Sequence, residues 1–483
     1  MKGNFKTLLR RFCLEGSVLG LKYFYLYPDP VSRCFWGITL FLSTLGACLL
    51  TYLLYQRFMD MPTHITIENQ YEPVYNLPYP AITLCSPNQI TFSAVEQFKH
   101  TIVNGNLTSN FDELAAQALG FNELLQKINF KNLQQFQDII TSNRYSVVNV
   151  ISLLSQNCST FLKRCFFRNK QYPCEELFEP VLTKLGVCCS FNSIYKFTND
   201  KRNEKKPNFV EHKVKKHGYS HGLTVIADYD PNNAVDGTIQ HAGATRVILT
   251  DWSEFPLEVE STLAHPGVEV FHIISATYTY CSTEVEKLPL ASRNCIFRDE
   301  KVLPHFGEYH NTDCDLNCLI DKVEFHCQCL FFYVPNVSPH RVCNFSKIPC
   351  IADVKFHMTE VPAILSCGCM RDCVSRRYSI EHFTGNLQAV QHVVHDRYTG
   401  IVFNESTTVM HFYFPKTTFV RQKQETVISL INFFSNLGGV FGLCLGFSHI
   451  SLFEICFYIY IGIKNYIQKR RTTRRRRRIG YSN

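Results

Sequence analysis

The stretch that decides the fold lies at residues 428–463 and reads ISLINFFSNLGGVFGLCLGFSHISLFEICFYIYIGI, with Glu454 as its only formal charge. A helix that crosses a bilayer needs about 20 apolar residues, so this stretch is too long for one plain helix. Its glycine cluster permits a break, because non-helical backbone is tolerated at membrane depth where it lines a water-filled cavity. We therefore predict a membrane helix that is interrupted in the middle.

The small residues of this stretch follow a helical spacing. Gly438, Gly442 and Gly446 are four residues apart, and Ser435 lies close to the same stripe. Small residues at this spacing let membrane helices pack closely. One interpretation is that the carbonyl groups from Gly446 to Ser448 line a narrow pore, with Glu454 as a charged ring on its inner side, since a carboxylate within a membrane segment favours an ion path. The alternative is a glycine-rich packing helix in which Glu454 pairs with a neighbour.

A second membrane segment precedes the bulk of the chain. Cys34 to Tyr55 contains no charged residue and is long enough to span a bilayer. Six Lys or Arg residues lie within residues 1–33 and nine within residues 464–483, so the positive-inside rule predicts that both termini are cytoplasmic. The sequence thus predicts a two-span plasma-membrane protein with five parts: a cytoplasmic tail (1–33), a first membrane helix (34–58), an extracellular domain (59–427), a second membrane helix (428–463) and a basic cytoplasmic tail (464–483).

Net charge and cysteine usage narrow the class further. The basic residues of the two tails explain the formal charge of +8, so the charge does not indicate a nucleic-acid partner. We expect these tails to contact membrane lipid, and Arg474–Arg478 are candidates to bind anionic headgroups. Of the 22 cysteines, 17 fall between Cys85 and Cys373, which indicates an oxidising compartment. The C-x-C spacings are poor for zinc and favour disulfides. Five glycosylation sequons lie in the same region, at Asn106, Asn157, Asn336, Asn344 and Asn404.

The region between the two membrane segments predicts a mixed α+β domain. Residues 94–155 show helical periodicity, which predicts two to four helices. Residues 222–228, 245–250 and 268–280 are β-branched and partly alternating, which predicts a mainly antiparallel core sheet. The polar run 200–216 is expected to be a mobile surface loop. Asp251, Trp252 and Glu254 form an acidic-aromatic cluster for which a surface turn is favoured over a ligand site.

At this point several short motifs resemble a known family. They are YPAITLC at 79–85, GVCCSFN at 186–192, RNCIF at 293–297, the cysteine spacings that follow, and Gly446-Phe447-Ser448. In this order, between two membrane segments, they are similar to the degenerin/epithelial sodium channel (DEG/ENaC) superfamily, in particular to its insect pickpocket branch. The resemblance covers essentially the whole chain and implies a trimer whose extracellular domain has a palm and β-ball sheet core with a helical finger, knuckle and thumb.

The resemblance also implies roles for individual residues. Gly446, Phe447 and Ser448 resemble the selectivity filter, Ser435 falls at the degenerin position, and Leu19 and Gly20 fall in the gating segment before the first helix. The residues expected to line the pore or gate are Ser435, Asn436, Gly438, Gly439, Gly442 and Glu454. The chain departs from the family pattern at Leu19, at Asn436 and at Phe457, where the family often has histidine or an acid.

The family's cysteine pattern implies seven disulfides in this chain. They are Cys85–Cys188, Cys165–Cys174, Cys295–Cys373, Cys314–Cys369, Cys318–Cys367, Cys327–Cys350 and Cys329–Cys343. Cys158, Cys189 and Cys281 are left over. Nested cross-links of this kind would stiffen a thumb that transmits movement to the membrane.

We therefore expect a subunit of a trimeric, amiloride-sensitive-type sodium channel, gated by its extracellular domain and assembled as a homo- or hetero-trimer. No nucleophile elbow, phosphate loop or metalloprotease helix is present, so no catalytic residue, metal or cofactor is expected, and Na⁺ is the permeant ion. One alternative is a non-conducting regulatory or obligate hetero-trimer subunit. A more distant one is an ATP-gated trimer, which would not explain the C-x-C spacings or Gly446-Phe447-Ser448.

Overall fold

The computed structural model describes residues 10–17, 20–27, 29–60, 62–102, 111, 114–115, 130–200, 202–235, 238–239, 241–257, 260–360, 367–387 and 396–479. The chain divides into two compact units. The membrane unit comprises Met1–His64, Ser282–Arg293 and Gln424–Asn483, and the cysteine-rich unit comprises Ile65–Cys281 and Asn294–Lys423. Each unit is therefore assembled from segments that are far apart in the sequence.

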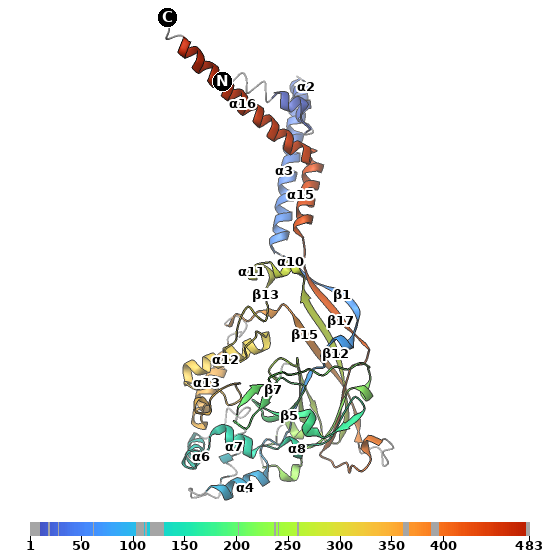
Figure 1. Cartoon of the computed structure of the whole chain (residues 1–483), viewed down its shortest axis with the longest axis vertical. Coiled ribbons are helices and arrows are strands. Elements are labelled where there is room, and N and C mark those ends of the chain that lie inside the picture. Colours follow the sequence, from blue (N-terminus) through green and yellow to red (C-terminus); the bar gives the residue numbers. More distant parts are fainter. Residues whose placement is uncertain are drawn as a thin grey trace. The chain divides into compact units, whose positions relative to one another are not determined.

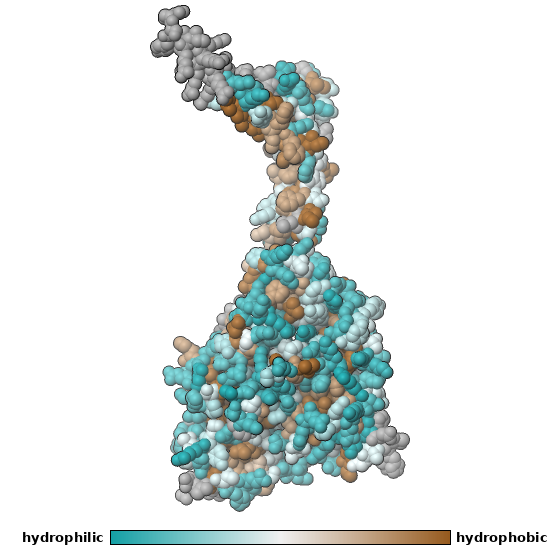
Figure 2. Space-filling view, in the orientation of Figure 1, coloured by the Kyte–Doolittle hydropathy of each residue, from teal (hydrophilic) through white to brown (hydrophobic). Residues whose placement is uncertain are grey.

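The membrane unit is helical. Its elements are α2 (Leu21–Leu26), α3 (Pro30–Asp60), α10 (Thr283–Glu286), α11 (Leu290–Arg293), α15 (Leu430–Leu445) and α16 (His449–Ile479). Helices α3 and α15 run side by side, with the rings of Phe58 and Phe433 at a centroid distance of 5.2 Å (Figure 1). Within the described residues, α3 and the part of α16 from His449 to Gln468 are long and apolar enough to cross a membrane. Apolar side chains lie on the outer surface of these helices (Figure 2), as expected for contact with lipid.

Two sheets form the centre of the cysteine-rich unit. In the described chain, the larger sheet has the order β1-β17-β12-β16-β9-β3-β4, and β15 also pairs with β12. Its strands are β1 (Thr63–Pro73), β3 (Leu162–Phe167), β4 (Lys170–Tyr172), β9 (Leu223–Asp228), β12 (Val268–Cys281), β15 (Ser375–Asn386), β16 (Thr407–Tyr413) and β17 (Thr418–Thr426). The smaller sheet has the order β11-β10-β2-β6-β5, with β11 (Glu260–Ala264), β10 (Thr245–Thr250), β2 (Ala81–Cys85), β6 (Gly186–Phe191) and β5 (Phe178–Thr183).

The three strands predicted from β-branched runs are present as β9, β10 and β12. Strands β12 and β16 pair in parallel. The pairs of β12 with β15, β16 with β9, β9 with β3, and β3 with β4 are antiparallel, as are those of the smaller sheet. Apolar side chains from both sheets, including Ile82, Val225, Val247 and Phe412, are buried in one cluster. Strand β2 is buried at every residue, which agrees with its mostly apolar sequence, and the hydroxyl of its one polar residue, Thr83, lies 2.8 Å from that of Ser190.

Helices cover the remaining part of the cysteine-rich unit. They are α4 (Phe92–Thr101), α6 (Phe130–Ser142), α7 (Val147–Leu154), α8 (Cys158–Phe161), α9 (Cys174–Leu177), α12 (Asn311–Cys327) and α13 (Ile348–Glu360). The side chains of Thr91 and Ser146 cap α4 and α7 by accepting hydrogen bonds from main-chain N–H groups, as N-cap residues do. Helices α4, α6 and α7 lie in the region where two to four helices were predicted. Two short ladders, β7 (Tyr195–Phe197) with β8 (Asn203–Lys205) and β13 (Cys295–Ile296) with β14 (Arg371–Asp372), complete the unit.

The expectation of a surface loop at residues 200–216 holds for most of the described segment, but Asn203–Lys205 form strand β8. Asn203 begins β8 and is 1 % exposed. Its side chain accepts a hydrogen bond from the main-chain N–H of Leu182 and donates to the carbonyl oxygens of Leu182 and Tyr333. A single buried amide thus anchors a segment whose charged composition alone indicated solvent exposure.

The expected turn at Asp251 forms, since Glu254 N donates to the main-chain carbonyl oxygen of Asp251 at 3.1 Å, but Asp251 is buried rather than at the surface. The Asp251 carboxylate is fully buried and accepts hydrogen bonds from Arg376 Nη1, at 3.1 and 2.9 Å, and from the Ser253 hydroxyl at 2.6 Å. The cation that permits this burial lies on β15, 125 residues further along the chain. The local sequence therefore gave no indication of it.

Eight disulfides are present in the described chain, all in the cysteine-rich unit. Seven join the pairs that the family resemblance implied, and the eighth joins Cys158 to Cys189. Cys314 and Cys318 are one helical turn apart on α12, so they lie on one face and pair with Cys369 and Cys367. Gly368, between these two partners, has φ +60°, a conformation that favours glycine.

Four of the five sequons lie in described residues. Asn157, Asn336, Asn344 and Asn404 are all exposed, so each is accessible for glycan attachment. Asn106 lies outside the described residues. Use of these sequons stays a prediction.

Candidate ion pathway

The second membrane segment is interrupted at its glycine cluster. Helix α15 ends at Leu445, and Gly446 follows with φ 61° and ψ 24°, in the left-handed region that favours glycine. Gly446 N donates to the carbonyl oxygen of Gly442 at 2.9 Å, and the next helix begins at His449. Residues 446–448 are therefore non-helical, where the glycine pattern predicted a break.

A serine hydroxyl holds the end of this break. Ser451 Oγ accepts a hydrogen bond from the main-chain N–H of Ser448 at 3.0 Å, while Ser451 N donates to the carbonyl oxygen of Ser448. Ser451 is fully buried, although its neighbours on α16 are mostly exposed. The geometry of Ser448 thus depends on Ser451, which the sequence analysis did not single out.

The residues of α15 that are expected to line the pore are exposed in the single chain. Ser435, Asn436, Gly438, Gly439 and Gly442 are all exposed. A Cβ atom added to Gly438 or Gly439 would meet nothing within 4 Å. The glycine stripe of α15 is therefore an open surface on which another helix can pack closely.

The carboxylate of Glu454 is bound by the N-terminal segment. Ser17 N donates a hydrogen bond to Glu454 Oε2 at 2.8 Å, and the hydroxyls of Ser17 and Ser451 lie 2.5 Å apart. The sequence left two interpretations of Glu454 open, a charged ring in the pore or pairing with a neighbour. The structure shows a hydrogen-bond partner for Glu454 within the same chain. Nothing in the sequence pattern pointed to Ser17, because its contacts lie more than 430 residues away.

The contact between the N-terminal segment and α16 extends for two helical turns. Tyr458 donates through its hydroxyl to Glu15 Oε2 at 3.0 Å, and its ring meets that of Phe12 edge to face at 5.3 Å. Ser451, Glu454 and Tyr458 are spaced by three and four residues, so they share one face of α16. The hydrogen bonds from Arg11 and Tyr458 lower the pKa of Glu15 and favour its charged form.

Of the expected gating segment, which consists of Leu19 and Gly20, the structure describes Gly20. Gly20 is buried, precedes α2 and has φ +91°. A Cβ atom there would lie 2.8 Å from Leu40 Cδ2, so the conformation and the close approach to α3 both require glycine. Leu19 lies outside the described residues.

A buried glutamine joins three segments of the membrane unit. Gln424 Nε2 donates to Thr63 Oγ1 at 2.9 Å and to the carbonyl oxygen of Arg293 at 3.1 Å. The main-chain carbonyl oxygen of Gln424 accepts a hydrogen bond from Ser282 N at 3.0 Å. Thr63 follows α3 closely and Gln424 precedes α15, so this side chain connects the ends of both membrane helices with the segment that carries α10 and α11.

Several acidic groups are buried where the loop after β10 meets the start of α12. Burial raises the pKa of Asp313 to about 8, and burial together with the charges of Asp251 and Asp313 raises that of Glu254 to about 8. One carboxylate oxygen each of Glu254 and Asp372 and one ring nitrogen of His310 lie within 4.8 Å of one another. Burial lowers the pKa of His310 to about 3, so this group is a neutral imidazole beside a largely protonated Glu254. Burial raises the pKa of Asp372 only to about 6, so the trio is a largely buried polar cluster in which the Asp372 carboxylate is charged near neutral pH.

Comparisons with known proteins agree with this architecture. The family model described as amiloride-sensitive sodium channel matches residues 12–458. Sodium channel protein Nach of Drosophila ananassae is 25 % identical over 97 % of this chain and 89 % of its own length. Pickpocket protein 28 of Drosophila melanogaster is 25 % identical over 93 % and 78 %. Acid-sensing ion channel 2 of Homo sapiens is 22 % identical over 94 % and 86 %.

The family match runs from the N-terminal segment, through both sheets and the cysteine-rich helices, to the second half of the interrupted membrane segment. It therefore includes the first candidate membrane helix, the break at residues 446–448, the first part of the second candidate helix and the contacts of Ser17 with α16. This family consists of ion channels, not enzymes, and its members named above are sodium, pickpocket and acid-sensing channel proteins. The chain belongs to the amiloride-sensitive sodium channel family, as a two-span, pickpocket-type sodium channel subunit of the DEG/ENaC superfamily.

Proposed function

We propose that this chain forms a trimeric, amiloride-sensitive, sodium-selective channel, with both termini in the cytoplasm, and that movement of the cysteine-rich unit gates it. The observation that carries the proposal is the non-helical segment 446–448 between two apolar helices. Backbone that leaves its helix within a membrane segment needs another partner for its carbonyl groups, and a hydrated cation is such a partner. Because the segment contains no acidic side chain, its carbonyl dipoles are the groups available to replace water around Na⁺.

In a trimer, neighbouring subunits would cover the surface of α15 that is exposed in the single chain. The exposed glycine stripe on α15 offers close approach between helices, and copies of α15 around an axis would cover it. A related subunit with a comparable glycine stripe would pack in the same way, so the proposal applies to a homo-trimer and to a hetero-trimer. Lipid contacts the remaining apolar surface of α3 and α16, and the arginines at 474–478 attract anionic headgroups.

Gating requires a link between α3, α15 and the rest of the chain. The hydrogen bonds of Gln424 provide such a link within the membrane unit. Gln424 lies on β17, which leads into α15, and it binds Thr63, which follows α3, and Arg293, which ends α11. Disulfides stiffen the unit from which a stimulus would start. Movement that reaches β17 is then passed to α15 directly along the chain.

The test is whole-cell current in cells that express this chain alone, with Ser435 replaced by a bulky residue to favour the open state. Replacement of bath Na⁺ by a large organic cation should abolish inward current, and amiloride should block it. Gly446→Ala should alter the ratio of sodium to potassium permeability, because alanine is strained at φ +61°. Gly46→Ala on α3, where an added Cβ atom meets nothing within 4 Å, is the matched control. Unchanged selectivity in Gly446→Ala and in Ser448→Cys would contradict the filter assignment.

A second candidate function is that of a regulatory or obligate hetero-trimer subunit that does not conduct alone. The observation that favours it is the engagement of Glu454 by Ser17, which reduces the negative charge offered to a permeant cation. Co-expression with related pickpocket-type subunits distinguishes the two functions. A regulatory subunit, delivered to the cell surface, gives no current alone but changes the amplitude or selectivity of its partner's current.

A further inference from the structure

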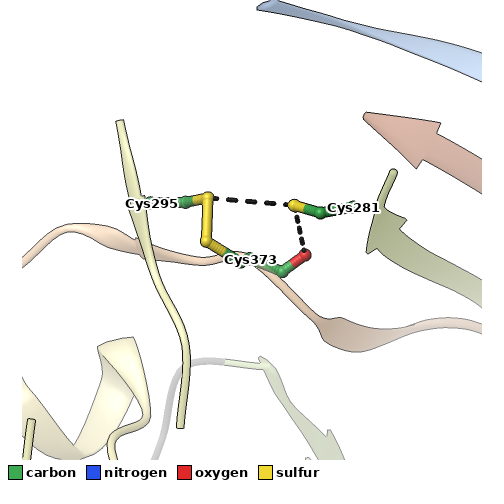
Figure 3. Close-up of side chains that lie close together, drawn as sticks. All are labelled: Cys281, Cys295 and Cys373. Atoms are coloured by element: carbon green, nitrogen blue, oxygen red, sulfur yellow. Dashed lines mark hydrogen bonds between the residues drawn. A yellow bond between two sulfur atoms is a disulfide. The ribbon is translucent and has the colours of Figure 1, made fainter. Parts of the chain in front are cut away.

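Three cysteine sulfur atoms meet in the interior of the cysteine-rich unit (Figure 3). Cys281 ends β12 and carries a thiol, whereas Cys295 at the start of β13 forms a disulfide with Cys373. Cys281 Sγ lies 4.0 Å from Cys295 Sγ and donates to the carbonyl oxygen of Cys373 at 3.3 Å. All three sulfur atoms lie within 4.8 Å of one another, and each residue is at most 5 % exposed.

The existing disulfide holds two short strands together. Cys295 pairs with Arg371 in the parallel ladder of β13 and β14, and Cys373 N donates to the carbonyl oxygen of Ile296 at 3.0 Å. The bond joins residues separated by 78 positions, and the chain between them contains α12, α13 and four further disulfides. Cys295–Cys373 is therefore the closure at the base of this helical region.

Cys281 and Cys295 also delimit a different segment. The residues between them include Ser282–Arg293, which belong to the membrane unit and carry α10 and α11. The carbonyl oxygen of Arg293 and the N–H of Ser282, at the two ends of this segment, both bind Gln424. A bond between Cys281 and Cys295 would close this short segment into a covalent loop.

We propose that Cys281 is the resolving thiol of an internal disulfide switch. The Cys281 thiolate attacks Cys295 Sγ, the Cys281–Cys295 bond forms, and the Cys295–Cys373 bond breaks with its electron pair on Cys373. The proton lost by Cys281 is taken up by the Cys373 thiolate. One thiol and one disulfide exist before and after the step, so no external oxidant or reductant is needed.

The exchange would open the loop closed by Cys295–Cys373 and close the shorter segment between Cys281 and Cys295 instead. In the first state β13 is joined to the residue after β14, and in the second it is joined to the end of β12, around the segment of α10 and α11. The Cys281 sulfur lies beside the disulfide in Figure 3, whereas thiol attack proceeds along the line of the S–S bond, so the Cys281 side chain must turn before it reacts. Displacement of the end of β12 or the start of β13 permits that turn, which makes the reaction sensitive to conformation.

The experiment uses the full chain, purified in detergent without reductant. One sample is held at mildly acidic pH and one at mildly alkaline pH, where the attacking thiolate is more populated. Both are quenched with acid, denatured, alkylated and digested without reduction, and the cross-linked peptides are identified by mass spectrometry. Among the three cysteines, we expect alkylation to shift in part from Cys281 to Cys373 at alkaline pH, and the 295–373 cross-link to be replaced in part by a 281–295 cross-link, while the total thiol content stays constant.

Two comparisons make the result decisive. The other seven disulfides should keep their partners in the same digests, which distinguishes a local exchange from general reshuffling. Cys281→Ala should retain Cys295–Cys373 under both conditions. The proposal is overturned if wild-type protein keeps Cys281 as the alkylated residue at alkaline pH, or if the 295–373 bond rearranges equally in Cys281→Ala.

Discussion

Gln424 donates a hydrogen bond through Nε2 to the carbonyl oxygen of Arg293, over 3.1 Å and across 131 residues of sequence. The same nitrogen binds Thr63 Oγ1, and the Gln424 side chain is 1 % exposed. A buried amide that satisfies partners on two other segments stabilises one arrangement of all three, because any displacement leaves a polar group unpaired away from water.

Gln424→Leu should destabilise the protein by about 1–3 kcal/mol, because it leaves the carbonyl oxygen of Arg293 without this donor in a buried position. Thermal unfolding of the detergent-solubilised protein measures the loss. Gln422→Leu, the same substitution two residues earlier on β17 at a partly exposed side chain, should cost less. Equal losses in the two variants would show that burial of Gln424 is not the reason for its effect.

The contact between the N-terminal segment and α16 predicts a specific cross-link. With the native Cys13, Cys444 and Cys456 replaced by serine, Ser17→Cys with Ser451→Cys should form an intrachain disulfide on mild oxidation, since the two hydroxyl oxygens lie 2.5 Å apart. Cleavage between α3 and Cys85, where none of the eight disulfides of the described chain bridges the cut, followed by gel electrophoresis without reductant, detects the bond. Ser17→Cys with Ser435→Cys is the control and should remain unlinked. A cross-link of equal yield in both pairs would exclude a defined contact.

Asp313 predicts an unusual dependence of stability on pH. Burial raises its pKa in the folded protein to about 8, whereas an unfolded aspartate has a pKa of about 3.9. The folded state keeps the proton over a range in which the unfolded state has released it. The contribution of this group to stability is therefore complete below about pH 4, and it is lost as pH rises toward 8, at a rate on the order of 1 kcal/mol per pH unit.

Asp313→Asn tests this prediction, because asparagine resembles the protonated side chain and retains an oxygen for the N–H of Phe255. Relative to wild type, the variant should become more stable as pH rises from 5 to 8, about the range between the two pKa values. Melting temperatures at several pH values measure the difference. Asp299→Asn, at an exposed residue, should show a constant difference from wild type. A constant difference for Asp313→Asn as well would refute the prediction.

The disulfide that the family resemblance left unassigned should contribute measurably to stability. Removal of Cys158–Cys189 by a double alanine substitution should cost about 2–4 kcal/mol, since the bond joins residues 31 positions apart. Removal of Cys165–Cys174, which spans 9 positions, should cost about 1 kcal/mol less by the loop-entropy relation. Denaturant unfolding of the two variants gives the comparison. A larger loss for the shorter loop would show that packing around the sulfurs, rather than loop length, dominates.

Local sequence patterns predicted those features of the fold that depend on neighbouring residues. Strands β9, β10 and β12 were predicted from runs of β-branched residues, and the break after Leu445 from a glycine that tolerates φ 61°. Apolar runs of sufficient length predicted the membrane helices, because the bilayer selects by length and hydrophobicity alone. The resemblance to a family supplied the seven disulfide pairs, which residue spacing by itself left open.

The tertiary structure decided what depends on contacts between distant residues. Asp251 is buried because Arg376 lies beside it, Glu454 is bound because the N-terminal segment reaches α16, and Cys281 lies beside a disulfide because β12 ends near β13. The sequence by itself determined the two membrane spans, the oxidised region between them and the glycine break, since composition and periodicity act locally. Which polar and sulfur-containing groups meet follows only from how the chain folds back on itself, because the energy of a buried charge, amide or thiol depends on partners that no local pattern specifies.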